Sequence, residues 1–294
     1  MIRYNISPDD LRQRIEAINP TWLTRAAERT RTYARSRDYT GGSEFWGQIK
    51  QVYIDLQHEK CAYCEMKMGG SVLARKVHEV EHFRPKSQVS AWPTPKQTYQ
   101  PDFFVGRASD TGYYKLAYHP LNYAISCTRC NSTLKSDYFP IRGRRRRTAL
   151  ADPAQAQSED ALLIYPISDL DADPETLITF HGVLAVPRQA QGPDHQRARV
   201  TIEFFQLNHE DLTMRRARQL YGLFGALEAA NDPGARASTR RTNADIVDTA
   251  CDPTNQFSAC MKAFRDLYLR DRPRAERFAA LARQLIPDAE TIEE

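Results

Sequence analysis

Several features that would set this chain apart from ordinary intracellular proteins are missing. The first ten residues, MIRYNISPDD, have no apolar core and no small-residue cleavage site, so we predict no secretory signal. No apolar run approaches the roughly 20 residues that cross a bilayer, and the longest candidate, YGLFGAL, is short and broken by glycine. The chain also has no internal repeat and no low-complexity tract. We therefore expect a cytoplasmic protein that does not contact a membrane.

The composition is that of a folded globular protein. The 294 residues allow roughly two domains of about 150 residues, or one elaborated domain. Hydrophobic residues make up 41% and charged residues 27%, which excludes a disordered or fibrous chain. In an intracellular chain the six cysteines are expected to be metal ligands or thiols rather than disulfides. Cys251 and Cys260 stand alone in the sequence, and we expect both to be buried.

The other four cysteines form two Cys-x-x-Cys pairs, Cys61 with Cys64 and Cys127 with Cys130. Four thiolates at this spacing predict one closed tetrahedral zinc site, in which each pair presents two sulfurs at about 2.3 Å from the ion. Between Cys64 and Cys127 lie 62 residues (127 − 64 − 1), so the ion would hold both ends of a long insert. The alternative is a redox pair, which expects one such motif rather than two.

Glu81 and His82 lie inside that insert. Hydrolysis of a phosphodiester needs a group that takes a proton from water and a divalent ion that neutralises the developing charge. A histidine suits the first task because its pKa is near neutrality, and a carboxylate oxygen suits a magnesium ion. Adjacent residues in a strand point to opposite faces, so both serve one site only if the strand ends or bulges there. Pro85 makes such an ending plausible.

Two asparagines and a lysine flank the second cysteine pair. Asn122 precedes Cys127 by five residues, and its amide is a candidate to hold the imidazole of His82 and its loop. Asn131 follows Cys130 directly and is a candidate second ligand of the catalytic ion. Lys135 would lie on the same face if a helix starts at Asn131, which would bring a cation near the scissile phosphate.

The remaining segments predict mainly helices. Ser7-Pro8-Asp9-Asp10 starts one helix, and apolar residues from Phe45 to Leu56 predict another that leads to Cys61. Residues 88–111 predict a loop, and residues 113–118 a short strand. The runs LLIYP, ITF and VLAVP predict a small hairpin, and three further helices follow from about residue 210, from 257 to 269 and after Pro273.

The pattern C-x2-C, E-H-x2-P, N-x4-C-x2-C-N-x3-K resembles the HNH endonuclease superfamily, whose site is a ββα-metal unit. More narrowly, CAYCE, VEHFRPKS, SCTRCN and YFP resemble the HNH proteins that accompany an ATPase in Septu-type and some retron antiphage systems. The resemblance is specific over residues 61–140 and looser to about residue 216. It implies an α+β fold: a ββα-metal core with four-cysteine zinc knuckles, embedded in N- and C-terminal helical segments.

The resemblance also implies roles for individual residues. His82 would be the general base, Glu81 and Asn131 would bind the catalytic ion, and Asn122 would orient the base. Many members have aspartate in place of Glu81 and histidine in place of Asn131. Because an amide is a weak ligand for soft metals, Mg²⁺ or Mn²⁺ is expected over a catalytic zinc. His78 and His119 remain candidate ligands or orienting groups.

Basic residues lie close to these motifs. Next to a nuclease motif they are candidate phosphate contacts, which position a nucleic acid without reading its sequence. The candidates are Arg84, Lys86, Lys135, Arg144, Arg145, Arg146 and Arg147. Nothing in the sequence resembles a recognition helix.

We therefore expect a helical brace over residues 1–60, an HNH nuclease domain over 61–150, and a hairpin with a helical region over 151–294. The leading hypothesis is a metal-dependent endonuclease that hydrolyses DNA as the effector of an antiphage system, with structural Zn²⁺, catalytic Mg²⁺ or Mn²⁺ and an ABC/SMC-like ATPase as partner. One alternative is a zinc-stabilised nucleic-acid-binding or adaptor module that has lost catalysis. Another is a redox protein.

Overall fold

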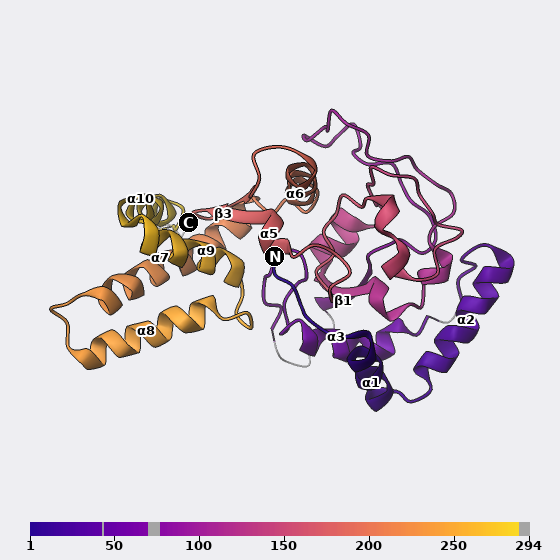
Figure 1. The fold of residues 1–294 in the computed structure, drawn as a ribbon, viewed down its shortest axis with the longest axis horizontal. Helices are drawn as coiled ribbons and strands as arrows, with labels where there is room; N and C mark the ends of the chain where they lie inside the picture. Colours follow the sequence, from indigo (N-terminus) through magenta and orange to yellow (C-terminus); the bar gives the residue numbers. More distant parts are fainter. Residues whose placement is uncertain (43, 70–76, 288–294) are drawn as a thin grey trace, which may run out of the picture.

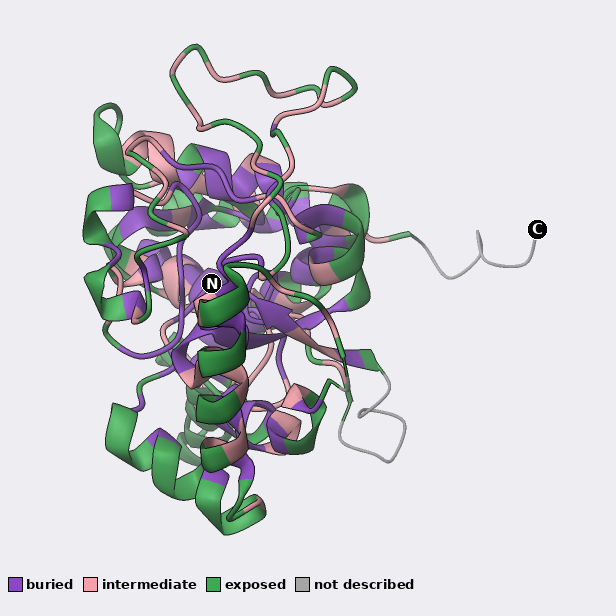
Figure 2. Ribbon diagram, turned by 90° about the vertical axis from the view of Figure 1, so that its right-hand side faces the viewer, coloured by how far each residue is buried: buried purple, intermediate pink, exposed green. Residues whose placement is uncertain are grey.

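The computed structural model describes residues 1–42, 44–69 and 77–287 of the chain. As expected, it is a mixed α+β structure in which helices predominate and the described strands form two separate two-stranded sheets. Figure 1 shows two lobes: the N-terminal helices and the first sheet lie on one side, and helices α7 to α10 lie on the other, with β3 between α5 and α9. Figure 2 shows buried residues in the interior and exposed residues along the outer turns of the helices.

The N-terminal segment consists of helices packed against the first sheet. Its elements are α1 (Pro8–Ile18), α2 (Trp22–Ser36), η1 (Trp46–Ile49) and α3 (Lys50–Leu56). Ser7 caps α1 by accepting from the backbone N–H of Asp10, which confirms the predicted helix start. The indole of Trp22 is fully buried and meets the ring of Tyr123 in the sheet edge-on. This contact fixes the helices against the sheet.

The first sheet pairs β1 (His78–His82) with β2 (Tyr123–Cys127) in antiparallel order. It is followed by the short π-helical segment η4 (Arg129–Lys135). Residues 88–111 form a loop without helix or strand, as predicted. The strand predicted at residues 113–118 is wrong: the structure has the 3-10 turn η2 (Tyr114–Leu116), because these aromatic side chains are buried in contact with the core and not paired along a ladder.

The second sheet is the predicted hairpin of β3 (Ile178–His181) and β4 (Leu184–Pro187). Residues 162–166 are wrongly assigned to it, because LLIYP is a buried irregular segment outside both sheets. The predicted C-terminal helices are confirmed.

The remaining helical elements of the described chain are η3 (Pro120–Asn122), η5 (Pro153–Gln155), η6 (Gln157–Glu159), α5 (Pro174–Leu177), α6 (Pro193–Phe204), α7 (Glu210–Asn231), α8 (Ala237–Cys251), α9 (Ser258–Arg270) and α10 (Arg272–Gln284). Within the described ranges, none of the helices combines the length and apolar character that a bilayer crossing requires.

Candidate metal centre and active site

The four cysteines of the two Cys-x-x-Cys pairs come together in space. Cys61 and Cys64 lie on the turn after α3, Cys127 ends β2, and Cys130 lies in η4. Their sulfur atoms all lie within 4.8 Å of one another, and all four side chains are buried. Tetrahedral coordination at about 2.3 Å puts sulfurs a little under 4 Å apart. The four thiols are therefore positioned to hold one zinc ion.

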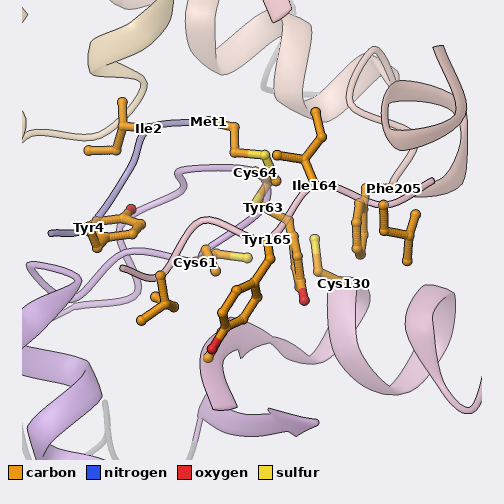
Figure 3. Packing of buried hydrophobic residues seen from close by; sticks show 14 of the residues in the cluster. Met1, Ile2, Tyr4, Cys61, Tyr63, Cys64, Cys130, Ile164, Tyr165 and Phe205 are labelled. Carbon is orange, nitrogen blue, oxygen red and sulfur yellow. The ribbon is translucent and has the colours of Figure 1, made fainter. Parts of the chain in front are cut away.

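The backbone around these cysteines is held by hydrogen bonds. The N–H of Cys61 donates to Met66 O at 3.0 Å, which closes the turn, and the N–H of Ala62 donates to Ile125 O at 2.9 Å, which joins the turn to β2. Tyr63, between the two cysteines, stacks on Phe205 with ring centroids 3.9 Å apart. In Figure 3 both rings lie beside Cys130. The turn therefore keeps its position relative to β2.

Glu65, directly after Cys64, is a buried carboxylate that the sequence analysis did not single out. It accepts from the N-terminal ammonium of Met1 and from Ser258 Oγ at 3.0 Å, and Lys60 Nζ lies 3.6 Å away. Burial alone would raise the pKa of Glu65, but the N-terminal ammonium and Lys60 lower it to about 2. Because Ser258 begins α9, this carboxylate couples the cysteine turn to the C-terminal helices.

The register of the first sheet separates the candidate catalytic residues onto two faces. His82 pairs with Tyr123 and Glu81 with Ala124, and β1 ends at His82, as Pro85 predicted. Since successive side chains alternate, Glu79 and Glu81 share one face and His82 lies on the other. The face with the two glutamates packs against η4.

His82 lies in a buried pocket of aromatic rings. The rings of Trp46 and Tyr123 meet its imidazole edge-on, with centroids 4.7 and 4.9 Å away. Its Nε2 lies 3.0 Å from the carbonyl oxygen of Ala117, which also accepts the Tyr123 hydroxyl at 2.6 Å. Because a carbonyl only accepts, Nε2 carries the proton and Nδ1 keeps its lone pair in the neutral ring. Burial, followed by the charge of Lys86, lowers the pKa of His82 well below 6.5, so the ring is neutral at neutral pH.

Glu81 forms a buried ion pair with the lysine of η4. Lys135 Nζ lies 3.2 Å from Glu81 Oε1, and both side chains are almost fully buried. Burial raises the pKa of Glu81 to about 7 in spite of the nearby ammonium, and burial also lowers the pKa of Lys135. The carboxylate of Glu81 and the ammonium of Lys135 therefore stabilise each other in the buried, low-dielectric interior, where either charge alone would be costly.

Asn131 does not contact Glu81; it contacts Glu79, which sequence reasoning missed. The Nδ2 of Asn131 donates to Glu79 Oε2 at 2.8 Å, and Ser132 Oγ donates to the same oxygen at 2.6 Å. Because a carboxylate accepts only, this contact fixes which end of the Asn131 amide faces Glu79 and turns Oδ1 away from it. The sequence did contain a signal for this role of Glu79. It lies two residues before Glu81, a spacing that puts both carboxylates on the same face of a strand.

Asn122 is fully buried and holds the loop that follows β1. Its Oδ1 accepts from the N–H of Arg84 at 2.9 Å, and its Nδ2 donates to the carbonyls of Arg84 and Leu116 at 3.0 and 3.2 Å. Among the described contacts, none joins the amide to the imidazole of His82. Asn122 therefore connects the backbone on both sides of the pocket around His82.

Replacing Asn122 by alanine is expected to lower the free energy of unfolding by about 2 kcal/mol, because three buried backbone groups lose their partner. Urea denaturation followed by circular dichroism measures the change. Asn122→Asp is the matched variant, since it can still accept from Arg84 N–H but cannot donate to the two carbonyls. An unchanged unfolding midpoint in Asn122→Ala would contradict the bracing role.

Two of the predicted phosphate contacts are engaged inside the protein. Arg84 is only 6% exposed, and its Nε lies 3.0 Å from Glu159 Oε2. Glu159 also accepts from the hydroxyl of Tyr113 at 2.9 Å. Lys135 pairs with Glu81, as described above. In this structure Arg84 and Lys135 stabilise the fold and do not reach the surface that a nucleic acid would touch.

The other basic candidates divide by exposure. Lys86 is half-buried with its Nζ 4.8 Å from the centre of the Trp46 ring. Arg145 donates to Tyr113 and to two backbone carbonyls, and Arg147 is half-buried. Arg144 and Arg146 are exposed. The arginine block is therefore partly structural.

The two further histidines occupy different positions. His78 is buried and pairs with Cys127 in the sheet register, and burial lowers its pKa. His119 accepts from the N–H of Leu121 through Nδ1 at 3.2 Å, and burial lowers its pKa to about 4. His119 thus caps the turn η3. It is Ala117, two residues earlier, that contacts Nε2 of His82.

The fold and site define an α+β protein built around a four-cysteine cluster with a sheet and short helix attached. The chain is similar to the Septu protein PtuB of Bacillus mycoides (strain KBAB4), with 28% identity over 172 residues. The match covers 58% of this chain and 50% of that protein, so the chain spans about half the length of this curated relative. The resemblance to the Septu-type proteins is thereby confirmed. No family model matches the chain, and no solved structure matches it.

Proposed function

We propose that the chain is a metal-dependent endonuclease of the HNH type that hydrolyses phosphodiester bonds of DNA. The order of elements supports this proposal: two antiparallel strands are followed by a short helix, and the cysteine cluster joins them. In this proposal the cluster has a structural role, and β1 and η4 carry the catalytic side chains.

The single observation that carries the proposal is the contact between His82 Nε2 and the carbonyl of Ala117. It selects the tautomer in which Nδ1 is unprotonated, and burial keeps the ring neutral at neutral pH. Nδ1 would accept a proton from the attacking water as its oxygen bonds to phosphorus and the bond to the leaving oxygen breaks. A binding module would not need the free Nδ1 for its activity.

The residues on the η4 side fit a hard divalent ion in their chemistry. Glu79, Glu81 and Asn131 offer carboxylate and amide oxygens on the same side of the sheet, the donor type that Mg²⁺ or Mn²⁺ prefers. Glu81 and Asn131 would hold the ion, with Glu79 orienting the amide. Because β1 ends at His82, a phosphate at that end of the sheet would have to reach both the ion on the η4 side and His82 on the opposite side. A bound ion would neutralise the charge that develops on the phosphate. Lys135 is buried and would stay paired with Glu81.

The DNA contacts in this proposal are the basic side chains that remain near the surface. Lys86 lies on the His82 side of the sheet, and Arg144 and Arg146 extend from the loop after Pro140. Such cations bind phosphates without reading bases. Arg84, Lys135 and Arg145 would act from inside the fold, by holding the elements that present the site.

The similarity to a Septu protein supports a role as the effector nuclease of an antiphage system that works with an ABC/SMC-like ATPase. The match is confined to about half of that relative, so the partner and trigger are part of the proposal.

A plasmid-cleavage assay tests the function. Purified protein is incubated with supercoiled DNA and Mg²⁺ or Mn²⁺, and a parallel sample contains the partner ATPase. Conversion to nicked or linear DNA that needs the divalent ion is expected. Binding to DNA without any cleavage under both conditions would favour a zinc-stabilised adaptor, in which Glu81 stays paired with Lys135 and binds no metal ion.

Glu79→Gln is expected to lower the cleavage rate about tenfold. A glutamine amide at this position can donate as well as accept, so it no longer fixes the orientation of the Asn131 amide. The hydrogen bond from Asn131 to the charged carboxylate is worth roughly 1.5–3 kcal/mol. The required concentration of divalent ion should rise as well, which a merely structural effect would not produce. Glu16→Gln, at an exposed position of α1, is the control. Unchanged metal dependence in Glu79→Gln would remove this residue from the site.

A further inference from the structure

A basic hollow lies in the C-terminal lobe, apart from the cysteine cluster and His82. It has a volume of about 340 Å³ and opens between β3, the segment after β4, α9 and α10. In Figure 1 these elements lie in the lobe opposite β1. Its cationic side chains are Arg188, Lys262, Arg265, Arg270 and Arg274, and its acidic ones are Glu175 and Asp266. Nothing in the proposed nuclease function uses these residues.

The charges in the basic hollow do not balance. Lys262 lies 3.5 Å from Glu175, and Arg265 lies 2.9 Å from Asp266, so each carboxylate has its own cation. Five cations and two carboxylates leave an excess of three positive charges (5 − 2). In the part of the chain that the structure describes, no carboxylate pairs with Arg188, Arg270 or Arg274. Like charges gathered around one concavity repel each other and attract an anion.

One wall of the basic hollow is apolar and closely packed. Phe180 and Phe278 line it, and Phe278 covers the hairpin turn at Gly182. Gly182 has a φ of +59°, and a Cβ there would lie 2.9 Å from a ring carbon of Phe278. A side chain at this position would push the ring away, so the glycine allows the hairpin and α10 to meet. The wall is thus formed by elements in direct contact.

We propose that the basic hollow binds the phosphate groups of a nucleotide or of a nucleic-acid strand. Guanidinium groups match phosphate oxygens with two parallel hydrogen bonds, and Arg270, Arg274 and Arg188 come from different elements around one space. The volume falls within the range of about 300–1,000 Å³ of small-molecule sites. Phe278, over whose ring the Arg274 guanidinium lies at 5.7 Å, gives the hollow an aromatic edge beside which a base or sugar would pack. Binding at this site does not depend on hydrolysis at His82.

The test is a binding titration of the zinc-loaded 294-residue chain without added divalent ions. Three probes are compared: inorganic tripolyphosphate, ATP and a fluorescent oligothymidylate of about ten nucleotides. Equal affinity for tripolyphosphate and ATP indicates recognition of the phosphate chain alone. Tighter binding of ATP indicates a nucleotide site. Binding of the oligothymidylate that is competed by ATP indicates a site for a nucleic-acid backbone. Each of these results supports the proposal.

The variant Arg270→Gln/Arg274→Gln is expected to weaken the tightest probe by about tenfold or more, the loss of two charge-assisted contacts. The matched control, Arg218→Gln/Arg241→Gln, removes the same charge from exposed positions on α7 and α8 and should change the affinity by less than about twofold. Arg188→Gln is a second, independent variant, and zinc content verifies the fold of each protein. The proposal is wrong if no probe binds, or if the hollow variants and the control bind alike.

Discussion

Replacing His82 by alanine is expected to lower the rate of plasmid cleavage by about 10²–10⁴-fold, the usual contribution of a general base. The reason is the state of the imidazole: Nε2 donates to Ala117 O at 3.0 Å, and burial lowers the ring's pKa, so Nδ1 is available at neutral pH. No other described side chain combines this tautomer with a position at the end of β1. The rate is measured as conversion of supercoiled to nicked DNA at saturating divalent ion.

His119→Ala is the matched control for His82. It also removes a histidine that burial keeps neutral, but this imidazole caps the turn at Leu121 and does not adjoin β1. Cleavage within about threefold of the unmodified protein is expected, well below the loss of a general base. Because His82 packs against Trp46 and Tyr123, His82→Asn serves as a second variant that keeps more volume and polarity. Equal rates for the unmodified protein and both His82 variants would eliminate His82 as the base.

Replacing Cys127 by serine is expected to remove the bound zinc and lower the melting temperature by about 10 °C or more. The four sulfurs lie within 4.8 Å of one another in a buried cluster, so the loss of one thiolate leaves three ligands and an incomplete tetrahedron. An ion held by these cysteines would join the turn after α3 to the end of β2 and to η4, and no disulfide connects these segments among the described cysteines. Metal analysis should find about one zinc per chain in the unmodified protein and none in the variant.

Cys251→Ser controls for the chemical change itself. Cys251 is buried, as Cys127 is, but it lies at the end of α8 outside the cluster. This variant should keep about one zinc per chain and lose only the small energy of a buried thiol. Full zinc occupancy in Cys127→Ser would show that the four cysteines do not share one ion. Treatment with a strong chelator should reproduce the effect of Cys127→Ser in the unmodified protein.

The cysteine cluster and the strand end at His82 were predictable because each depends on local sequence. Two Cys-x-x-Cys pairs have a ligand spacing that few other sites share, and Pro85 limits how far β1 can extend. The helix starting after Ser7 was predictable for the same reason, since capping acts within one turn. Aromatic runs were misleading: residues 113–118 have strand composition but form a turn, because burial in the core and not ladder pairing decides their conformation.

The sequence by itself determined the four cysteines that are positioned for zinc, the helical segments at both ends of the chain and the presence of a Glu-His pair beside two asparagines. Only the tertiary structure decided which of these side chains meet. It brings Glu79 to Asn131, Lys135 to Glu81 and Glu159 to Arg84, pairs separated by 52, 54 and 75 residues. The linear sequence does not show which residue a charged side chain will pair with. Strand register and helix packing bring the two partners together, and because an unpaired charge is costly in the buried interior, each buried charge needs its partner.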